Sequence, residues 1–236
     1  MQIEFSKLMR PFSSDRFLLA HSGGPDSVAL FALFLHLRQH FAVHFEVMHI
    51  HHGPSEKYLA ARNHAQGFVE EQCQSHQVPF HTNVPATAGE LISEKALRDF
   101  RYNLLAATRI QMQGDWVVLA HHKKDQLETR LIRLIRGVGG QGIDAMQLTQ
   151  KFYLRPLLDF MPADLQNYNR HKGFHWVTDP SNSDSSYLRN WLRNEWLQNL
   201  ENYRPGAVAS LSRSLEILAE HSQGQEFACI VDGVIK

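Results

Sequence analysis

Cysteine is scarce in this sequence, with only Cys73 and Cys229 among 236 residues. The two lie too far apart to form a Cys-x-x-Cys pair, a zinc-ligand spacing or a disulfide framework, so a reducing compartment is favoured. The formal net charge is zero. There is therefore no general electrostatic attraction for a polyanion, and a nucleic-acid partner would need local basic patches.

Long apolar segments are absent as well. Residues 1–12 contain no apolar signal-peptide core, and no stretch approaches the ~18–20 apolar residues of a membrane-spanning helix. With 43% hydrophobic and 20% charged residues, the chain can bury a core, and disorder is disfavoured. We therefore expect a soluble cytoplasmic protein with no membrane partner. A homodimer stays open, because the sequence does not set the oligomeric state.

Short apolar segments alternate with longer helical patterns in the first two thirds of the chain. The predicted strands cover residues 16–21, 45–50, 78–84, 116–120 and 151–158. The first predicted helix is capped by Asp26 or Ser27 and contains the apolar residues from Val28 to Leu37. Further helices are predicted over residues 56–76, 90–112 and 126–136. This alternation predicts an α/β fold with an open, doubly wound parallel sheet. Helices alone are predicted afterwards, over residues 162–172, 186–200 and 205–222.

A glycine-rich turn, Ser22-Gly23-Gly24-Pro25-Asp26-Ser27, connects the first strand to the first helix. Glycines allow a close approach of backbone to phosphate, and the helix N-terminus adds positive potential. A carboxylate beside an anion site indicates a bridging Mg²⁺. The alternative is an ordinary surface turn, but a turn at the carboxyl edge of a parallel sheet is a usual ligand position. The turn is neither a Walker A loop nor a dinucleotide fingerprint.

Two acids and one arginine follow near the strand at 116–120. Asp125 and Glu128 lie three residues apart at a helix start, so both face one side and suit Mg²⁺ binding or the orientation of an amine. Helix capping by acids is the alternative. Arg136 and Gly137 offer a guanidinium and an exposed amide to an anion, and an ordinary glycine helix stop is the alternative there.

Five ordered segments resemble the tRNA(Ile)-lysidine synthase family of PP-loop ATP-pyrophosphatases. They are Ser22–Ser27 (SGGPDS), Ala120–Thr129 (AHHKKDQLET), Arg136–Gly142 (RGVGGQG), Arg155–Leu158 (RPLL) and Asp179–Arg193, which holds DPSNSD and then Arg189, Asn190 and Arg193. The resemblance implies an adenine nucleotide alpha hydrolase-like PP-loop domain over residues 1–160. A helical appendage over residues 161–236 would follow it.

The resemblance also implies a two-step reaction. ATP, with Mg²⁺, adenylates the C2 oxygen of the cytidine at the first anticodon position of isoleucine tRNA, and pyrophosphate is released. The amine of lysine then attacks C2 and expels AMP, which leaves lysidine. The task of the protein is to hold the pyrophosphate, neutralise it and present a flipped base.

These tasks fall on three sets of residues. The implied ATP-binding set is Ser22, Gly23, Gly24, Pro25, Asp26, Ser27, His49 and His121. The implied catalytic set is Asp26, Asp125 and Glu128, with Asp26 and Asp125 as Mg²⁺ ligands and Glu128 orienting the amine. Phosphate or RNA contacts are predicted for Arg98, Arg101, Arg136, Gly137, Arg189 and Arg193.

Three features depart from the family pattern. Lys124 stands where the family has the first acid of an Asp-Asp pair, which inverts the charge there. Pro54-Ser55 follows Gly53, where the family has a basic residue. The relatives usually continue into further C-terminal domains that grip tRNA, so the chain is a fragment, a compact member or a diverged paralogue.

Five histidines, His49, His51, His52, His121 and His122, are expected at one sheet edge. A zinc cluster is one interpretation, but no cysteine joins them, so structural or substrate-lining histidines are favoured. Three other functions stay open besides lysidine formation. They are another PP-loop enzyme (a tRNA thiolase, disfavoured by the missing Cys-x-x-Cys, or an amide-forming synthetase), a weakened nucleotide-binding protein and a non-enzymatic RNA-binding module.

Overall fold

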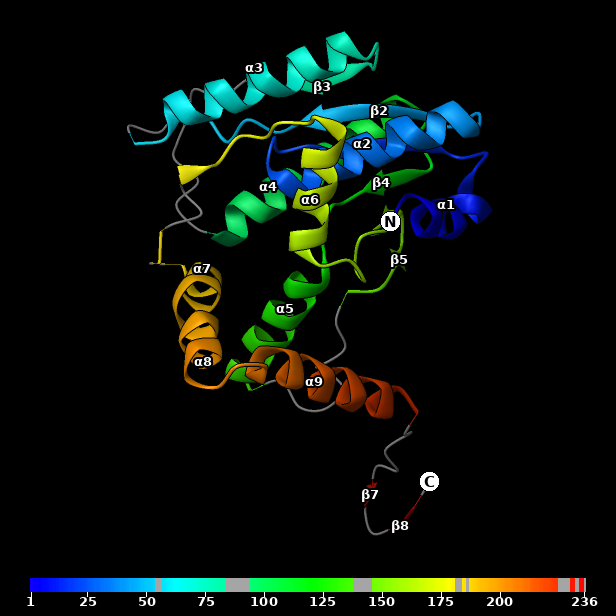
Figure 1. Ribbon diagram of the computed structural model, residues 1–236. Coiled ribbons are helices and arrows are strands. Elements are labelled where there is room, and N and C mark those ends of the chain that lie inside the picture. Colours follow the sequence, from blue (N-terminus) through cyan, green and yellow to red (C-terminus); the bar gives the residue numbers. More distant parts are fainter. Residues whose placement is uncertain are drawn as a thin grey trace. The chain divides into compact units, whose positions relative to one another are not determined.

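Six strands form one sheet in the computed structural model, which describes residues 1–53, 57–83, 94–137, 146–180, 184–185, 187–224, 230–231 and 234–235 (Figure 1). The strands are β1 (Arg16–Ala20), β2 (His44–His49), β3 (Phe80–Thr82), β4 (Trp116–Val118), β5 (Thr149–Gln150) and β6 (Tyr153–Leu154). Their order is β3-β2-β1-β4-β6-β5, and all neighbouring pairs are parallel except β5 with β6. The mostly parallel sheet predicted from the sequence is confirmed.

The helical segments follow the predicted pattern closely. They are α1 (Gln2–Met9), η1 (Arg10–Phe12), α2 (Pro25–His40), α3 (Leu59–Ser75), α4 (Glu94–Gln111), α5 (Lys123–Ile135), α6 (Pro162–Lys172), α7 (Leu188–Trp191), η4 (Leu192–Trp196), α8 (Leu197–Tyr203) and α9 (Ala207–Gly224). The sequence analysis did not anticipate α1 or β5. Two short strands, β7 (Ile230–Val231) and β8 (Val234–Ile235), pair antiparallel after α9.

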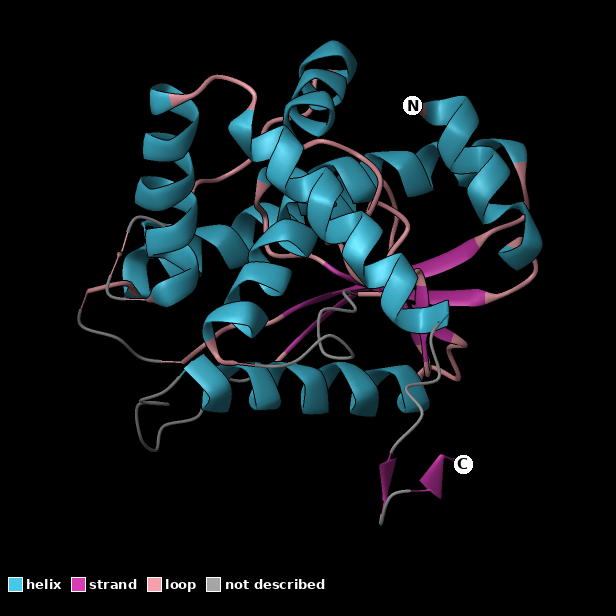
Figure 2. Cartoon of the chain, turned by 90° about the horizontal axis from the view of Figure 1, so that it is seen from below, coloured by secondary structure: helices cyan, strands magenta, loops and turns pink. Residues whose placement is uncertain are grey.

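The side chains of β1 alternate between two cores, one on each face of the sheet. Phe17 and Leu19 belong to the larger core with Phe34 of α2, whereas Leu18 belongs to the smaller core with Leu105 of α4. Helices therefore cover both sides of the strands (Figure 2). This explains why residues 17–19 are apolar without interruption, because a strand buried on both faces has no solvent side.

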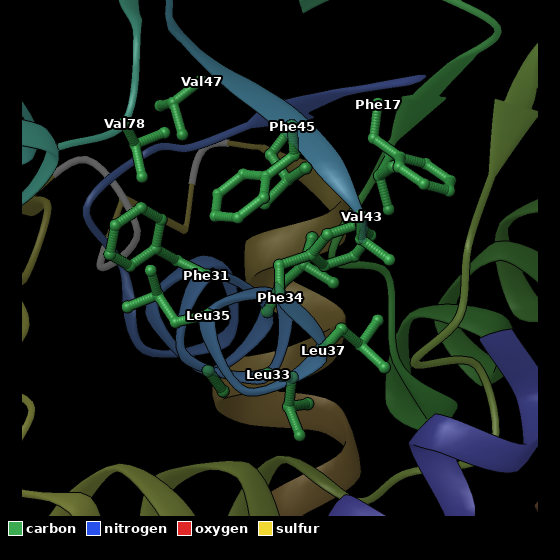
Figure 3. Packing of buried hydrophobic residues seen from close by; sticks show 14 of the residues in the cluster. Phe17, Phe31, Leu33, Phe34, Leu35, Leu37, Val43, Phe45, Val47 and Val78 are labelled. Carbon is green, nitrogen blue, oxygen red and sulfur yellow. The ribbon is translucent and has the colours of Figure 1, made fainter. Parts of the chain in front are cut away.

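Aromatic rings of α2 and β2 meet in the larger core (Figure 3). The Phe34 ring lies 5.5 Å from that of Phe45 and 5.2 Å from that of Phe17, both in edge-to-face geometry. Full burial of each such ring stabilises the fold by roughly 1.5–3 kcal/mol. This packing fixes α2, and with it the turn that precedes α2, against the centre of the sheet.

The strand order changes direction beside β1. From β1 the chain proceeds to β2 and β3 on one side, and β4 then pairs with the other side of β1. The segments after β1 and after β4 therefore emerge next to each other at the carboxyl edge. In open α/β sheets this switch point is where ligands bind.

The chain divides into two compact units, each discontinuous in sequence. Unit 1 comprises Met1–Lys124 and Gln147–Asp184, and unit 2 comprises Asp125–Met146 and Ser185–Lys236. The sequence analysis divides the chain once, at residue 160. Helix α6, which follows that point, packs on α2 within unit 1. The division into a catalytic domain and a helical appendage stays a prediction.

Unit 2 has its own leucine-rich core, which includes a π-helical turn. Leu192 and Leu197 are buried there, with 1% and 7% of their surface exposed, together with Leu127 and Leu131 of α5. In η4 the N–H of Leu197 donates to the carbonyl of Leu192, five residues back. The sequence predicts one regular helix over this region, and the π-helical turn divides it into α7 and α8. In the parts of the chain that the structure describes, no helix is long and apolar enough to cross a membrane.

Candidate functional site

The turn between β1 and α2 lies at the switch point of the sheet. Helix α2 begins at Pro25, with Gly24 as its N-cap and without a side-chain cap. The predicted cap at Asp26 or Ser27 is therefore wrong, because proline at the first helical position already has the φ that a helix requires. The first N–H groups of an α-helix have no intrahelical acceptor, so they are available to an anion.

The two glycines of the loop occupy different backbone and packing environments. Gly23 has φ +84°, and a Cβ there would lie 2.8 Å from Cγ2 of Val177. Gly24 has φ −73° and ψ 165°, which any residue adopts. A Cβ at Gly24 would meet only the Ser22 hydroxyl oxygen, at 3.4 Å. Packing and backbone conformation therefore require glycine at position 23 but not at position 24, where a role in ligand approach stays a prediction.

Contacts from α6 and from the segment after it hold the loop in place. The Asn169 side-chain amide donates to the carbonyl of Pro25 at 2.8 Å, and the Val177 N–H donates to the carbonyl of Gly23 at 3.0 Å. Within the loop, the Ser27 hydroxyl donates to the carbonyl of Gly24 at 2.9 Å. Asn169 is fully buried. The sequence analysis did not find Asn169, because only the tertiary packing of α6 on α2 brings it to the loop.

The carboxylate of Asp26 has one engaged and one unengaged oxygen. Oδ2 lies 3.5 Å from Nε2 of His122, the buried histidine after β4. Oδ1 is buried and has no hydrogen-bond partner. A buried carboxylate oxygen without a partner costs free energy, and Mg²⁺ is the type of ligand that satisfies it. Asp26 therefore fits the predicted metal-ligand role.

Among the residues that the structure describes, no three histidine, cysteine or acidic side chains form a group that could hold a metal by themselves. The zinc interpretation of the five histidines has no support in this part of the chain. Mg²⁺ sites in nucleotide-using enzymes usually take one or two carboxylates, with waters and substrate phosphates as the other ligands. Asp26 beside the loop matches that pattern.

Histidines at the end of β2 have hydrogen-bond partners within the protein. His49 Nδ1 lies 2.9 Å from the carbonyl oxygen of His21 and donates to it, which leaves Nε2 as an acceptor. Burial lowers the pKa of His49. His51 Nε2 lies 2.9 Å from Oδ1 of Asn63, and the Gly53 N–H donates to its Nδ1 at 3.1 Å. These contacts fit the structural and substrate-lining roles expected for the histidines.

Cations surround the segment after β2, although the basic residue of the family pattern is missing there. Residues 54–56 lie outside the described residues, but Arg62 of α3 donates to the carbonyl of Gly53 at 2.9 Å. Burial first, then the charges of Arg101 and Arg62, lower the pKa of His52 to about 4. Asp179 opposes this shift. Three separate elements therefore bring charged residues to His52.

The remaining predicted ligand contacts of unit 1 lie on α4 and after β4. Arg98 is exposed, and its guanidinium lies 4.8 Å from the ring centroid of Tyr102. Its Nη2 donates to the Tyr102 hydroxyl at 3.3 Å. His121 is half-buried directly before His122. Their predicted roles toward RNA and ATP stay predictions.

In unit 2, the two predicted acids bind the two predicted arginines. Arg193 donates from Nε to Glu128 Oε1 at 2.6 Å and from Nη2 to Oε2 at 2.7 Å. The same Nη2 donates to Asp125 Oδ1 at 2.9 Å. Arg189 Nη1 lies 3.8 Å from Asp125 Oδ1 and 3.9 Å from Glu128 Oε2. The site residues Asp125, Glu128, Arg189 and Arg193 thus form one charge-balanced network, in which the acids are buried and the arginines are partly exposed.

The contacts among these four residues restrict the ligand-binding roles predicted for them. Glu128 is fully buried and Asp125 is 8% exposed. A metal at Asp125, an amine at Glu128 or a phosphate at Arg193 would each displace a contact within the network. Asp125 belongs to unit 2 and Asp26 to unit 1.

Lys124 and the residues at the end of α5 lie on the surface. Lys124, which replaces the family acid, is exposed next to the buried Asp125. Arg136 is exposed, and Gly137, with φ +73°, ends α5 as a glycine helix stop. The glycines at 139, 140 and 142 lie outside the described residues.

Comparison with known proteins agrees with this geometry. The model of the PP-loop domain family matches residues 1–200. A tRNA(Ile)-lysidine synthase of Bdellovibrio bacteriovorus is 38% identical over 215 residues, which cover 89% of this chain and 65% of that protein. The tRNA(Ile)-lysidine synthase of Actinobacillus succinogenes is 36% identical over 227 residues, which cover 94% of this chain and 51% of that protein. The chain thus spans between about half and two thirds of the length of these relatives.

Solved structures show the same fold at low sequence identity. The U34-tRNA thiolase NcsA of Methanococcus maripaludis superposes with a TM-score of 0.73 at 17% identity, covering all of this chain and 82% of the thiolase. This likeness supports the fold alone. The phosphate loop at the switch point and the family match over residues 1–200 lead to one assignment: the chain belongs to the PP-loop domain family.

Proposed function

We propose that the chain is an ATP-dependent ligase that attaches lysine to C2 of the first anticodon cytidine of isoleucine tRNA. The similarity to two tRNA(Ile)-lysidine synthases over 89% and 94% of the chain supports this substrate. The chemistry rests on one structural observation. A buried Asp26 oxygen without a hydrogen-bond partner lies at the start of a helix that has no side-chain cap.

The residues of unit 1 divide the first step between them. The amides at the start of α2 bind phosphate, and Gly24 lets it approach the backbone. Asp26 holds Mg²⁺, which supplies positive charge to the phosphates. His49 and His121 line the nucleotide site, and Arg98 and Arg101 contact tRNA phosphate. Neutral His49 presents an acceptor and no charge, which suits the recognition of a base or a hydroxyl.

The residues of unit 2 are assigned to lysine and tRNA. Asp125 as a Mg²⁺ ligand and Glu128 as the group that orients the amine remain proposals. Each would exchange an oxygen contact with Arg193, whose guanidinium would then contact phosphate. Arg136, Gly137 and Arg189 complete the proposed RNA contacts. We further propose a cytoplasmic location, supported by the free, buried Cys73, and leave a homodimer as the arrangement to test by light scattering.

One assay tests the proposed function. The protein is incubated with labelled ATP, lysine and isoleucine tRNA, and AMP is measured. AMP formation that depends on both lysine and tRNA is expected. Asp26→Asn should abolish it, whereas Asp99→Asn, an exposed aspartate on α4, should not change it.

The same assay distinguishes the alternatives. ATP binding without AMP formation would indicate a weakened nucleotide-binding protein. Pyrophosphate release with a different nucleophile would indicate a sibling enzyme of the family, a thiolase or an amide-forming synthetase. tRNA binding without any ATP binding would indicate an RNA-binding module and would refute the proposal.

A further inference from the structure

His21 is a buried polar residue at a position where the strand pattern calls for an apolar one. It directly follows β1, and only 2% of its surface is exposed. Its ring lies 5.5 Å from the ring of Phe31 in the larger core. A buried imidazole requires hydrogen-bond partners for both nitrogens. The sequence alone gives no reason for a histidine here.

The partners of His21 fix the position of its proton. The Gly23 N–H points at Nδ1 at 3.0 Å. A backbone N–H can only donate, so Nδ1 must be the unprotonated nitrogen. Nε2 therefore carries the proton and donates it to Oε1 of Gln72 on α3, at 3.2 Å. The neutral Nε2–H tautomer follows from the backbone geometry.

The ring also contacts the hydroxyl that begins α2. Ser27 Oγ lies 3.2 Å from His21 Nδ1 and 2.9 Å from the carbonyl oxygen of Gly24. Ser22 Oγ lies 3.2 Å from the same hydroxyl. The single proton of Ser27 is donated to the Gly24 carbonyl, so the hydroxyl lies against Nδ1 without donating to it. The imidazole therefore orients one backbone amide of the loop and contacts one of its hydroxyls.

We propose that His21, anchored by Gln72, is a positioning residue of the phosphate loop. Its Nδ1 turns the Gly23 N–H inward, which stabilises the left-handed conformation of Gly23. The Gly24 N–H donates to Ser22 Oγ at 3.3 Å, so the donors left for phosphate are the N–H groups at the start of α2 after Pro25. The inference rests on the proposed function only in taking ATP as the ligand of the loop.

The electrostatics of the site agree with this role. Burial, and next the neighbouring His49, lower the pKa of His21 to about 3. The ring is therefore neutral at physiological pH. If Nδ1 were protonated, its N–H and the Gly23 N–H would be two donors facing each other without an acceptor. Their repulsion would open the loop.

Two substitutions at one position separate hydrogen bonding from packing. His21→Leu removes the acceptor, whereas His21→Asn places an amide oxygen the same number of bonds from the backbone as Nδ1. ATP affinity is measured by calorimetry with Mg²⁺ and without tRNA or lysine. His21→Leu should weaken ATP binding about tenfold, the effect of losing one to two hydrogen bonds that shape the site. His21→Asn should stay within about threefold of the wild type.

An exposed histidine on α3 serves as the matched control. His64→Leu should leave ATP affinity unchanged, because His64 faces solvent on the same helix as Gln72. Equal weakening in His21→Asn and His21→Leu would overturn the proposal, since both alter packing but only one removes the acceptor. Unchanged affinity in His21→Leu would also overturn it.

A spectroscopic measurement tests the proposal without any variant. Nitrogen NMR of the wild type should show the proton of His21 on Nε2, and the Gly23 amide should exchange slowly with solvent. A proton on Nδ1, or a fast-exchanging Gly23 amide, would refute the role even if His21→Leu failed to fold. Gln72→Met should accelerate that exchange, because the ring loses its anchor.

The failure of this inference can be told from the failure of the proposed function. If the wild type binds ATP but forms no AMP with tRNA and lysine, lysidine formation is refuted and the comparison of His21 variants still holds. If AMP forms normally and His21→Leu binds ATP as the wild type does, only the role of His21 is refuted.

Discussion

Alanine substitutions at three glycines should change stability in three different ways. Gly23→Ala places a Cβ 2.8 Å from Cγ2 of Val177, at a φ of +84°. The left-handed conformation costs about 1–2 kcal/mol for a residue with a Cβ, and the displaced valine adds about 1–2 kcal/mol. The free energy of unfolding should therefore fall by about 2–4 kcal/mol.

The other two glycines serve as matched comparisons. Gly24→Ala has an allowed backbone and one ordinary contact, so its stability should stay within about 0.5 kcal/mol of the wild type. Its ATP affinity should nevertheless fall, because the new methyl group lies in the loop. Gly67, inside α3, has open space around its Cβ position. Gly67→Ala should therefore raise the stability by about 0.5–1 kcal/mol.

Urea unfolding followed by circular dichroism measures all three variants, and calorimetry measures ATP binding. A loss below about 1 kcal/mol for Gly23→Ala would refute the packing argument, because strain alone should exceed that value. Unchanged ATP affinity in Gly24→Ala would show that phosphate does not approach the backbone there.

Three further predictions concern charge. Arg193→Met removes the three hydrogen bonds that this partly exposed guanidinium donates to Asp125 and Glu128, so stability should fall by about 1–3 kcal/mol; the exposed Arg204→Met is the control for urea unfolding, and equal effects in both would contradict the network. The pKa values of His21 and His52 are lowered to about 3 and about 4, below the 6.5 of the unfolded chain. The unfolded state therefore binds more protons below pH 6.5, and stability should fall from there to about pH 4 with a slope of about 1.4 kcal/mol per pH unit for each histidine. A free energy of urea unfolding that does not change with pH in this range would contradict the lowered pKa values of the two histidines. Lys124→Asp should leave AMP formation within about twofold, because exposed charges act weakly in water; a clear rise in turnover would show that the departure from the family acid costs activity.

Much of the fold follows from local sequence patterns. The uninterrupted apolar residues of β1 and β4 predict strands buried on both faces, and their alternation with long helices predicts the parallel sheet. The short helix α1 was not predicted, because its two buried residues, Phe5 and Met9, give too short a pattern. The π-helical turn at Leu192–Trp196 was missed because only packing in unit 2 reveals it.

The candidate site was predictable where its residues are neighbours in sequence. The loop at residues 22–27 was identified because a strand, two glycines and a helix start adjoin one another. The partner of His21, in contrast, is Gln72, and the support for Pro25 is Asn169. No local pattern connects residues so far apart. The helical spacing of Asp125 and Glu128 correctly placed them on one face, but their pairing with Arg193 depends on the packing of η4.

The π-helical turn gives its helix an unusual tolerance to a change in length. Leu192 and Leu197 share one core although they are five positions apart, and in a regular helix such a pair would point about 140° apart. Deleting one residue between them, such as Asn194, would leave a spacing of four, which an ordinary α-helix places on one face. Elsewhere in a helix, one deletion rotates all later side chains by about 100°. Here the shortened chain could relax into plain α-helix and keep both leucines inside.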